Sequence, residues 1–335
     1  MLAGSIVFLI FGFAVLLYAG DCLVRGALAA AYKTNVSPLL VGIVIVGFGT
    51  SLPEFLIAVT SAMDDKPGLA LGNIIGSNIA NIWLVLAIPA IIFPIATTAH
   101  RMRITAFVML CATAGWIGLT LVYGLNPMIG AGFIAALVLF ALVGWFIGRR
   151  DVSEDTPEEV KLQKIPFWRM STLILIGLVG LPLGSRLLVD GAISIAKETA
   201  LSEEAVGLTL LAVGSSLPEL GAALAASWRK QSDVAMGNIL GSNIFNILGA
   251  GGAVALLGPQ QLSQEFHGYS HWVMGLAAIS ITLLIFLRRK IGFVTSIFFL
   301  GFYAAYLTGL VLNWNFDEVR YLIIERPVVE SAPTP

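Results

Sequence analysis

The sequence predicts an all-α polytopic membrane protein in which ten transmembrane helices form two inverted five-helix repeats, with helices 2 and 7 broken. Three observations lead to this fold class. Of the 335 residues, 58% are hydrophobic and only 12% are charged, about half the charged fraction of a typical soluble protein. Apolar runs of roughly 20 residues, the length that a bilayer-spanning helix needs, follow one another along the chain. Two polar motifs in the first half of the chain also recur in the second half.

The apolar runs delimit ten spans joined by short loops. They lack the alternation of apolar and polar residues that barrel strands show. The one long hydrophilic stretch, Arg149 to Lys164, has mixed charges and is too short to fold by itself. We therefore expect a first repeat over 1–148, a linker over 149–169, a second repeat over 170–312 and a short outer tail over 313–335. The predicted spans cover residues 4–30, 37–63, 69–93, 104–123, 127–148, 170–196, 204–227, 234–257, 270–287 and 292–312.

Basic residues predict the orientation of the chain, because cytoplasmic loops of membrane proteins carry an excess of Lys and Arg. If the linker is cytoplasmic, most basic residues outside the spans fall on its side of the membrane. Only Lys66, Lys197, Arg320 and Arg326 fall on the other side. Both termini are then expected outside.

The two recurring motifs indicate a duplication. "GTSLPE" (Gly49 to Glu54) recurs as "GSSLPE" (Gly214 to Glu219), and "GNIIGSNIANI" (Gly72 to Ile82) recurs as "GNILGSNIFNI" (Gly237 to Ile247). Both recurrences have the same offset of 165 residues, as from Gly49 to Gly214. Because each repeat contains an odd number of spans, the second copy crosses the membrane in the opposite direction. Inverted repeats with interrupted helices are typical of transporters, whose site lies near the bilayer midplane.

Each "SLPE" segment places a proline and a carboxylate in the middle of a span. Pro53 and Pro218 lack an N–H and clash with the carbonyl four residues earlier, so each helix is expected to break just before its glutamate. An ionisable side chain at this depth, such as Glu54 or Glu219, costs about 2.5–3.5 kcal/mol on insertion scales and is a candidate functional residue. Spans 2, 3, 7 and 8 contain no Lys or Arg at comparable depth. The charge partner is therefore expected to be a cation from outside the chain.

The second motif adds further oxygen ligands. Residues spaced by four lie on one face of a helix, which places Asn73, Ser77 and Asn81 together, and likewise Asn238, Ser242 and Asn246. The Gly72/Gly76 and Gly237/Gly241 pairs follow the small-xxx-small pattern of closely packed membrane helices. Carboxylate, amide, hydroxyl and carbonyl oxygens suit Ca²⁺ and also Na⁺.

Other cofactors are not expected. The histidines, at positions 100, 267 and 271, lie near span ends, and no Cys/His cluster exists that would favour zinc or copper. Cys22 and Cys111 lie in apolar runs, which argues against a disulfide framework. The net charge of −1 indicates no nucleic-acid partner.

With these motifs the chain resembles the cation/calcium exchanger superfamily, in its sodium/calcium branch and near its bacterial members. The resemblance covers nearly all ten spans. It implies an antiporter in which Na⁺ and Ca²⁺ compete for one midplane site, in a bacterial inner membrane, with the ions and the lipid as its partners and no obligate protein partner. It also implies the cation ligands by motif position, with Gly47 and Ala212 contributing backbone carbonyls: Glu54, Glu219, Asn81, Asn246, Ser77, Ser242, Thr50, Ser51, Ser215, Ser216, Gly47 and Ala212.

Two details bear on which ions are exchanged. Proton-coupled relatives usually replace the hydroxyls beside the glutamate, whereas this chain keeps Thr50, Ser51, Ser215 and Ser216, which favours sodium coupling. Several relatives carry Asp at the position of Asn246. With Asn there, two carboxylates balance one Ca²⁺ or two Na⁺, whereas a third Na⁺ would leave one uncompensated charge in a low dielectric. The exchange ratio and any potassium dependence stay open.

Four more charged residues lie within spans 1 and 6. Asp21 and Arg25 are four residues apart, as are Arg186 and Asp190, so each pair can neutralise itself locally. At the offset of 165 the order of charges is swapped, because Asp21 corresponds to Arg186 and Arg25 to Asp190. We favour the structural interpretation of these pairs. The alternative is a latch or sliding contact for spans 1 and 6, which the resemblance implies are long gating helices.

Three functions are compared. The first is exchange of Na⁺ for Ca²⁺ by alternating access, and the second is Ca²⁺/H⁺ exchange on the same scaffold. The third comprises an intramembrane hydrolase or a passive channel. No histidine lies deep in the membrane to serve a Ser/His hydrolase, since all three lie near span ends. Asp21 and Asp190 each have an adjacent arginine, which disfavours an aspartyl dyad. We therefore expect an antiporter and no enzyme.

Overall fold

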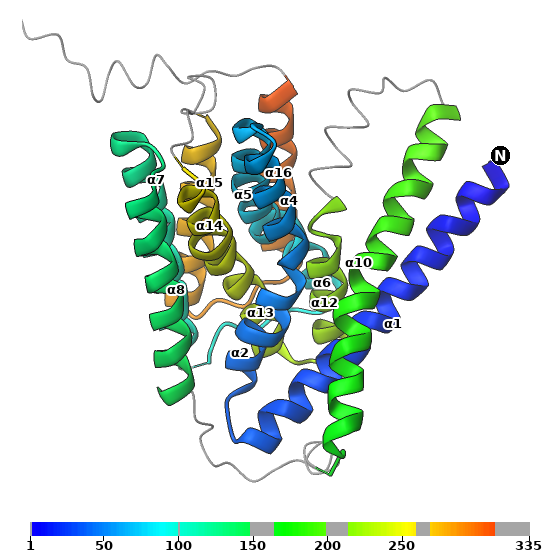
Figure 1. Ribbon diagram of the computed structural model, residues 1–335. Helices are drawn as coiled ribbons and strands as arrows, with labels where there is room; N and C mark the ends of the chain where they lie inside the picture. Colours follow the sequence, from blue (N-terminus) through cyan, green and yellow to red (C-terminus); the bar gives the residue numbers. More distant parts are fainter. Residues whose placement is uncertain (1, 100, 148–163, 199–213, 259–268, 312–335) are drawn as a thin grey trace, which may run out of the picture.

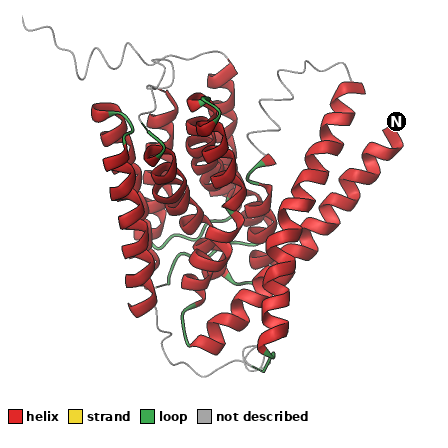
Figure 2. Ribbon diagram, viewed as in Figure 1, coloured by secondary structure: helices red, strands yellow, loops and turns green. Residues whose placement is uncertain are grey.

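In the computed structural model of the protein, residues 2–99, 101–147, 164–198, 214–258 and 269–311 are described. These residues form helices and loops, and their one β-type contact is an isolated bridge between Ile95 and Ile291; Figures 1 and 2 show the arrangement. The helices are α1 (Leu2–Thr34), α2 (Pro38–Val41), η1 (Gly42–Gly47), α3 (Phe48–Thr50), α4 (Leu52–Met63), α5 (Pro67–Ala80), η2 (Asn81–Val85), α6 (Ala87–Ile92), α7 (Met102–Tyr123), α8 (Pro127–Ile147), α10 (Phe167–Glu198), α12 (Leu217–Trp228), α13 (Ser232–Ile244), η3 (Phe245–Gly251), α14 (Gly252–Leu256), α15 (Tyr269–Phe286) and α16 (Phe293–Val311).

The described helices match the predicted spans. Eight are long and apolar enough to cross a membrane, and a ninth candidate is the bent pair formed by Pro38–Thr50 and Leu52–Met63. Nine of the ten predicted spans are thus found, with ends within a few residues of those expected. The remaining span, predicted over 204–227, is described only from Gly214 onward. Most of the linker and the C-terminal tail lie outside the described residues.

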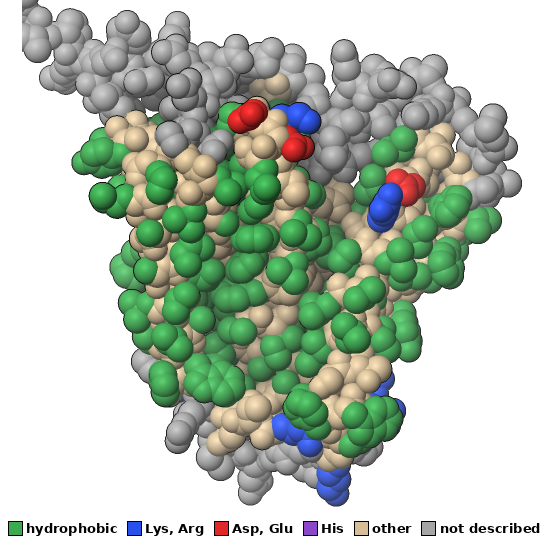
Figure 3. Space-filling model, viewed as in Figure 1, with side chains coloured by type: hydrophobic (Ala, Val, Ile, Leu, Met, Phe, Trp, Pro, Cys, Tyr) green, Lys and Arg blue, Asp and Glu red, His purple; other side chains and the backbone are tan. Residues whose placement is uncertain are grey.

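The distribution of apolar side chains is that of a membrane protein. Hydrophobic side chains cover the middle of the face shown in Figure 3, and charged ones lie mainly toward its two ends. The most apolar window of α8 is only 11% buried, whereas the window over Ser232–Leu256 is 83% buried and that over Pro67–Ile92 is 78% buried. The third and eighth predicted spans, which carry the second motif, therefore form the core.

The two longest helices, α1 and α10, pair along their length and lean away from the remaining helices at one end (Figure 1). Glycines permit this close pairing, because a Cβ on Gly12 would lie 2.8 Å from the backbone nitrogen of Leu188. A Cβ on Gly184 would lie 2.8 Å from that of Leu16. On its other side α1 packs against α12, which carries Glu219.

The glycine pair of the second repeat packs closely, as predicted. A Cβ on Gly241 would lie 2.7 Å from the backbone of Ile43, and one on Gly237 would meet the carbonyl of Leu39. This contact places α13 directly on η1, where the first repeat approaches its break. Around Gly76, in the first repeat, no described atom lies within 4 Å of a Cβ.

Candidate cation-binding site

Breaks in two helices position the glutamates. Between α3 and α4, Ser51 has φ −85° and ψ 4°, and the two helical parts meet at an angle of 43°. Ser216 has nearly the same backbone, φ −88° and ψ 4°, directly before α12. Glu54 and Glu219 consequently lie in the first turn of their helices, where backbone N–H groups favour a negative charge. The predicted break is confirmed before Glu54. Before Glu219 the backbone of Ser216 departs from the helix in the same way, and residues 199–213 lie outside the described residues.

The carbonyl that Pro218 was expected to release has a partner. Ser185 of α10 donates its hydroxyl to the Gly214 carbonyl at 2.7 Å. This hydrogen bond satisfies a buried backbone acceptor that would otherwise be costly in hydrocarbon. It also connects α10 directly to the broken helix of the second repeat.

Two asparagines support the backbone of the glutamates in the same way. Asn73 Nδ2 donates to the Glu54 carbonyl at 2.8 Å, and Asn238 Nδ2 donates to the Glu219 carbonyl at 3.0 Å. These donors are equivalent at the offset of 165 residues. Both were predicted to lie on the polar helix faces. That their amides bind the main-chain carbonyls of the glutamates could not be predicted from the sequence.

Hydroxyl groups connect the two repeats at the breaks. Ser51 Oγ donates to Glu219 Oε1 at 2.8 Å, and Ser242 Oγ donates to the carbonyl of Gly47 at 3.1 Å. Thr50 Oγ1 donates to the same Gly47 carbonyl and to Asn238 Oδ1, each at 3.3 Å. Ligand candidates from residues 47–51 and 219–242 therefore converge.

A second set of contacts joins the helices that carry the asparagines. Asn246 Nδ2 donates to Ser77 Oγ at 3.0 Å, and Asn81 Nδ2 donates to Asn243 Oδ1 at 3.3 Å. Asn81 and Asn246 both lie in π-helical segments, η2 and η3, a wider turn that is frequent at functional sites. Asn243 was missed as a site residue, although the repeated "GSN" in both motifs could have indicated it.

Several oxygens of this set are buried without a hydrogen-bond donor among the described residues. Glu54 is 1% exposed and Glu219 is fully buried. Neither carboxylate forms an ion pair with a described basic residue. The oxygens without a donor are both Oε1 and Oε2 of Glu54, Oε2 of Glu219, Oδ1 of Asn81 and of Asn246, and Oγ of Ser216.

Such a set fits a hard cation. Buried acceptors without donors are unfavourable unless a cation binds them, and six oxygen ligands are within the range that Ca²⁺ takes. Among the described residues, no group of three or more His, Cys, Asp or Glu side chains is placed so that it could hold a metal ion by itself. Amide, hydroxyl and carbonyl oxygens would therefore complete the coordination. Ser215 is partly buried, and Ala212 lies outside the described residues.

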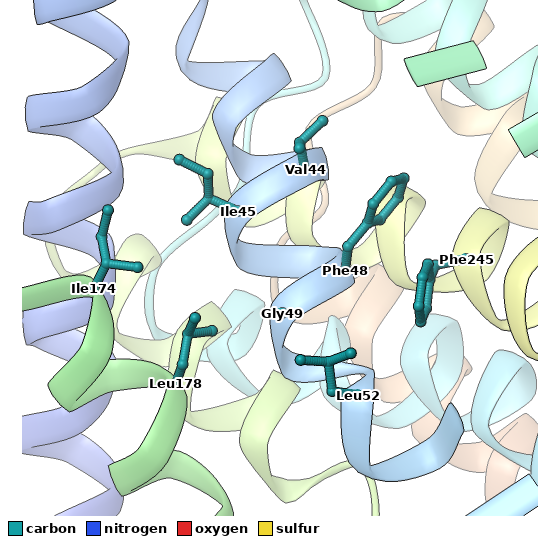
Figure 4. A pocket seen from close by; sticks show the side chains of 8 residues that line it. All are labelled: Val44, Ile45, Phe48, Gly49, Leu52, Ile174, Leu178 and Phe245. Carbon is teal, nitrogen blue, oxygen red and sulfur yellow. The ribbon is translucent and has the colours of Figure 1, made fainter. Parts of the chain in front are cut away.

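An apolar recess of about 390 Å³ lies beside the site, between the first broken helix and α10 (Figure 4). The rings of Phe48 and Phe245 stack at its edge, with centroids 5.0 Å apart. Its lining offers no side-chain oxygen, so this recess is distinct from the cation ligands. The lining residues are Val44, Ile45, Phe48, Gly49, Leu52, Ile174, Leu178 and Phe245.

The intramembrane ion pairs form as predicted, but one has an additional partner. Arg25 lies 3.8 Å from Asp21, and Arg186 lies 3.9 Å from Asp190. Asp21 also accepts from Arg229, at the end of α12, at 2.6 Å. Asp21 is therefore neutralised by two basic residues, Arg25 on its own helix and Arg229 on another. The sequence had assigned Arg229 only to the basic side of the membrane.

Comparison with known proteins places these features in a family. The model of the family described as sodium/calcium exchanger protein matches twice, over residues 4–146 and 170–312. The chain is similar to inner membrane protein YrbG of Escherichia coli K12, with 31% identity over 291 residues, 84% of this chain and 88% of the relative. It is also similar to sodium/calcium exchanger MaX1 of Methanosarcina acetivorans, with 26% identity in an alignment that covers 90% of this chain and 98% of the relative.

The fold is similar to solved structures of the sodium-calcium exchanger NCX_Mj. For crystals soaked with zero Na⁺ and Ca²⁺ the TM-score is 0.79, with 30% identity over 92% of this chain and 100% of the other. For crystals soaked with 2.5 mM Na⁺ and 0.1 mM Ca²⁺ the TM-score is 0.78, at the same identity. The similarity thus extends over nearly the whole of both chains.

Proposed function

The chain belongs to the sodium/calcium exchanger family, and we propose that it exchanges Na⁺ for Ca²⁺ across the membrane at the site described above. That membership makes the chain an integral membrane antiporter of Ca²⁺ and another cation. The choice of Na⁺, the shared site and alternating access between inverted repeats are our proposal. The relatives MaX1 and NCX_Mj, which are named as sodium/calcium exchangers, support the choice of Na⁺.

One observation carries the proposal. Two buried carboxylates, Glu54 and Glu219, lie among hydroxyl and amide oxygens and form no ion pair with a described basic residue. A carboxylate in this environment is strongly unfavourable without a counter-charge. A bound Ca²⁺ or two bound Na⁺ would supply that counter-charge, so the two ions compete for the same oxygens.

Competition at one buried site accounts for exchange. When the ions leave, two negative charges remain in a low dielectric, which opposes reorientation of the empty site through the membrane. The site therefore returns only with another cation bound. The ligands we assign are the two glutamates together with Asn81, Asn246, Ser77, Ser242, Thr50, Ser51, Ser215, Ser216 and the backbone carbonyls of Gly47 and Ala212.

Uptake into vesicles tests this proposal. Purified protein in vesicles loaded with Na⁺ is diluted into Na⁺-free buffer that contains radioactive Ca²⁺. We expect Ca²⁺ uptake that requires the outward Na⁺ gradient, and we expect Glu54→Gln and Glu219→Gln each to lower it at least about tenfold, since one charge is worth several kcal/mol in this environment. Thr113→Ala serves as the control, because its buried hydroxyl donates to Met109 within α7, outside the site.

The same assay distinguishes the other functions. Uptake that ignores Na⁺ but follows a pH gradient would select Ca²⁺/H⁺ exchange, the alternative for this scaffold. Flux without any counter-ion would indicate a channel. If Glu54→Gln left the Na⁺-dependent uptake intact, the assignment of ligands would be wrong.

We also propose a bacterial inner membrane as the location, with the linker in the cytoplasm and both termini outside. The printed name of the relative YrbG, an inner membrane protein, supports the location. The excess of Lys and Arg on one side supports the orientation. Reporter fusions that are active on only one side of the membrane, placed after residue 156 and after residue 335, should report opposite sides.

A further inference from the structure

An ion pair fastens α1 to the second repeat. Arg229, which follows the last residue of α12, donates from Nε and Nη2 to Asp21 Oδ1, both at 2.6 Å. The neighbouring residue Gly20 lies against Gly221 of α12, so closely that a Cβ would meet the Gly221 carbonyl. The contact lies toward the end of α1 that leads to Lys33.

The repeat provides an equivalent for each partner. At the offset of 165 residues, Asp21 corresponds to Arg186 on α10, and Arg229 corresponds to Asp64 at the end of α4. The local backbone is the same at both helix ends. Asp65 and Lys230 have φ of 54° and 56°, and their N–H groups donate to the carbonyls of Ala62 and Ser227, which are also equivalent. Asp64 is thus placed relative to α4 as Arg229 is placed relative to α12.

The signs of the charges are complementary in both cross-repeat pairs. Asp21 and Arg229 attract each other, and so would Arg186 and Asp64. A duplication that kept its charges unchanged would place like charges opposite each other in both pairs. Both positions differ in sign between the two copies, and both pairs are attractive only because both positions differ. Local neutralisation by Arg25 and Asp190 does not require any particular charge at positions 64 and 229.

In the structure only one of the two pairs is closed. Arg186 is 83% exposed at its side chain and pairs with Asp190 at 3.9 Å. Asp64 is exposed and forms no ion pair with a described residue. Likewise, α1 packs along α12, whereas no comparable contact joins the described parts of α10 and α4. The two equivalent pairs therefore differ, since Asp21–Arg229 is closed and Arg186–Asp64 is open.

We propose that Asp21–Arg229 and Arg186–Asp64 are alternative latches, each of which closes in one of the two states of the transporter. The structure has the first latch closed, and in the opposite state α10 would approach α4 and close the second. This inference rests on the proposed alternating access, and it assigns four residues outside the cation site to the switch. Because the pairs are partly exposed, each should shift the ratio of the two states by only about two- to fivefold.

Distances between spin labels test the proposal without measuring transport. Labels at Thr60→Cys on α4 and Leu183→Cys on α10, in a chain with Cys22→Ser and Cys111→Ser, would report the approach of the two helices. Thr60 and Leu183 are exposed, so labels should be tolerated. We expect Asp21→Asn to enlarge the short-distance population about two- to fivefold. Adding Arg186→Gln should return that population to its original size.

Neighbouring residues of equal charge are the matched controls. Asp65→Asn and Lys230→Gln each remove one charge from the loops that hold Asp64 and Arg229. Neither residue takes part in a latch, so both variants should leave the distances between the labels unchanged. Arg186→Asp alone should remove the short-distance population. Adding Asp64→Arg exchanges the charges of the second pair and should restore that population.

The outcomes separate this inference from the proposed function. If Asp21→Asn and Asp65→Asn had equal effects, or if the exchanged charges gave no restoration, the latches would be refuted even though Na⁺-driven uptake persisted. If the unsubstituted chain had a single distance population and no uptake, the proposed function itself would fail.

Discussion

Ser51 Oγ lies 2.8 Å from Oε1 of Glu219 and donates a hydrogen bond to it. This contact joins the break in one repeat to the carboxylate of the other, across 168 residues of sequence. The proposed cation site therefore draws on residues of both repeats, and neither repeat contains it alone. Changes at one break should affect the carboxylate of the opposite repeat.

Replacing Ser51 with Ala should weaken Ca²⁺ binding. The hydroxyl supports the charged form of Glu219, and a hydrogen bond to a charged group is worth about 1.5–3 kcal/mol, which corresponds to roughly ten- to hundredfold in affinity. Calorimetric titration of the purified protein with Ca²⁺ measures the change. Ser61→Ala, a buried serine farther along the same helix, is the control. Equal affinities in the two variants would contradict the shared site.

Replacing Gly47 with Ala should destabilise the protein and disturb the site together. A Cβ at this position would lie 2.8 Å from the Asn238 carbonyl and 2.9 Å from the Ser242 backbone nitrogen, and such overpacking costs about 1–3 kcal/mol. Thermal unfolding in detergent reports the loss. Gly118→Ala in α7 has no described atom within 4 Å of its Cβ, so its unfolding temperature should stay near that of the unsubstituted chain. A stable Gly47→Ala protein would show that the contact can relax.

The two asparagines that support the glutamates should differ in their contribution to stability. Asn73→Ala removes one hydrogen bond, to the Glu54 carbonyl, whereas Asn238→Ala removes two, because Asn238 also accepts from Thr50. At about 1 kcal/mol for each net bond, Asn238→Ala should lower the free energy of unfolding more. Equilibrium unfolding in denaturant gives both values. Equal losses in the two variants would mean that the Thr50 contact adds nothing, and the reverse order would contradict the prediction.

Replacing Asn246 with Asp should make the exchange sensitive to membrane potential. With two carboxylates, one Ca²⁺ or two Na⁺ would neutralise the site, and exchange in that ratio would move no net charge. A third carboxylate would hold a third Na⁺ without leaving an uncompensated charge. A potassium diffusion potential applied to vesicles should therefore change Na⁺-driven Ca²⁺ uptake in Asn246→Asp and leave it unchanged in Asn246→Gln. Sensitivity in the unsubstituted chain would contradict the charge balance.

Much of the fold follows from local sequence. The span over Met102–Tyr123 begins two residues before the predicted start and ends where it was expected, because hydropathy is a property of a continuous segment. The breaks at Ser51 and Ser216 follow from the prolines two residues later, which act only on their own helices. The π-helical segments were not predicted, since the sequence has no pattern that distinguishes them from ordinary helical turns.

What the sequence by itself determined is the set of candidate oxygen ligands and the burial of two glutamates without a nearby base, because both depend on residue type and on position within a span. Only the tertiary structure decided which partners meet: Ser51 with Glu219, Ser185 with the Gly214 carbonyl, and Arg229 with Asp21. Spacing within a helix defines the face on which a residue lies. It does not define the helix that covers that face, because the packing of distant segments depends on the shape of the whole core.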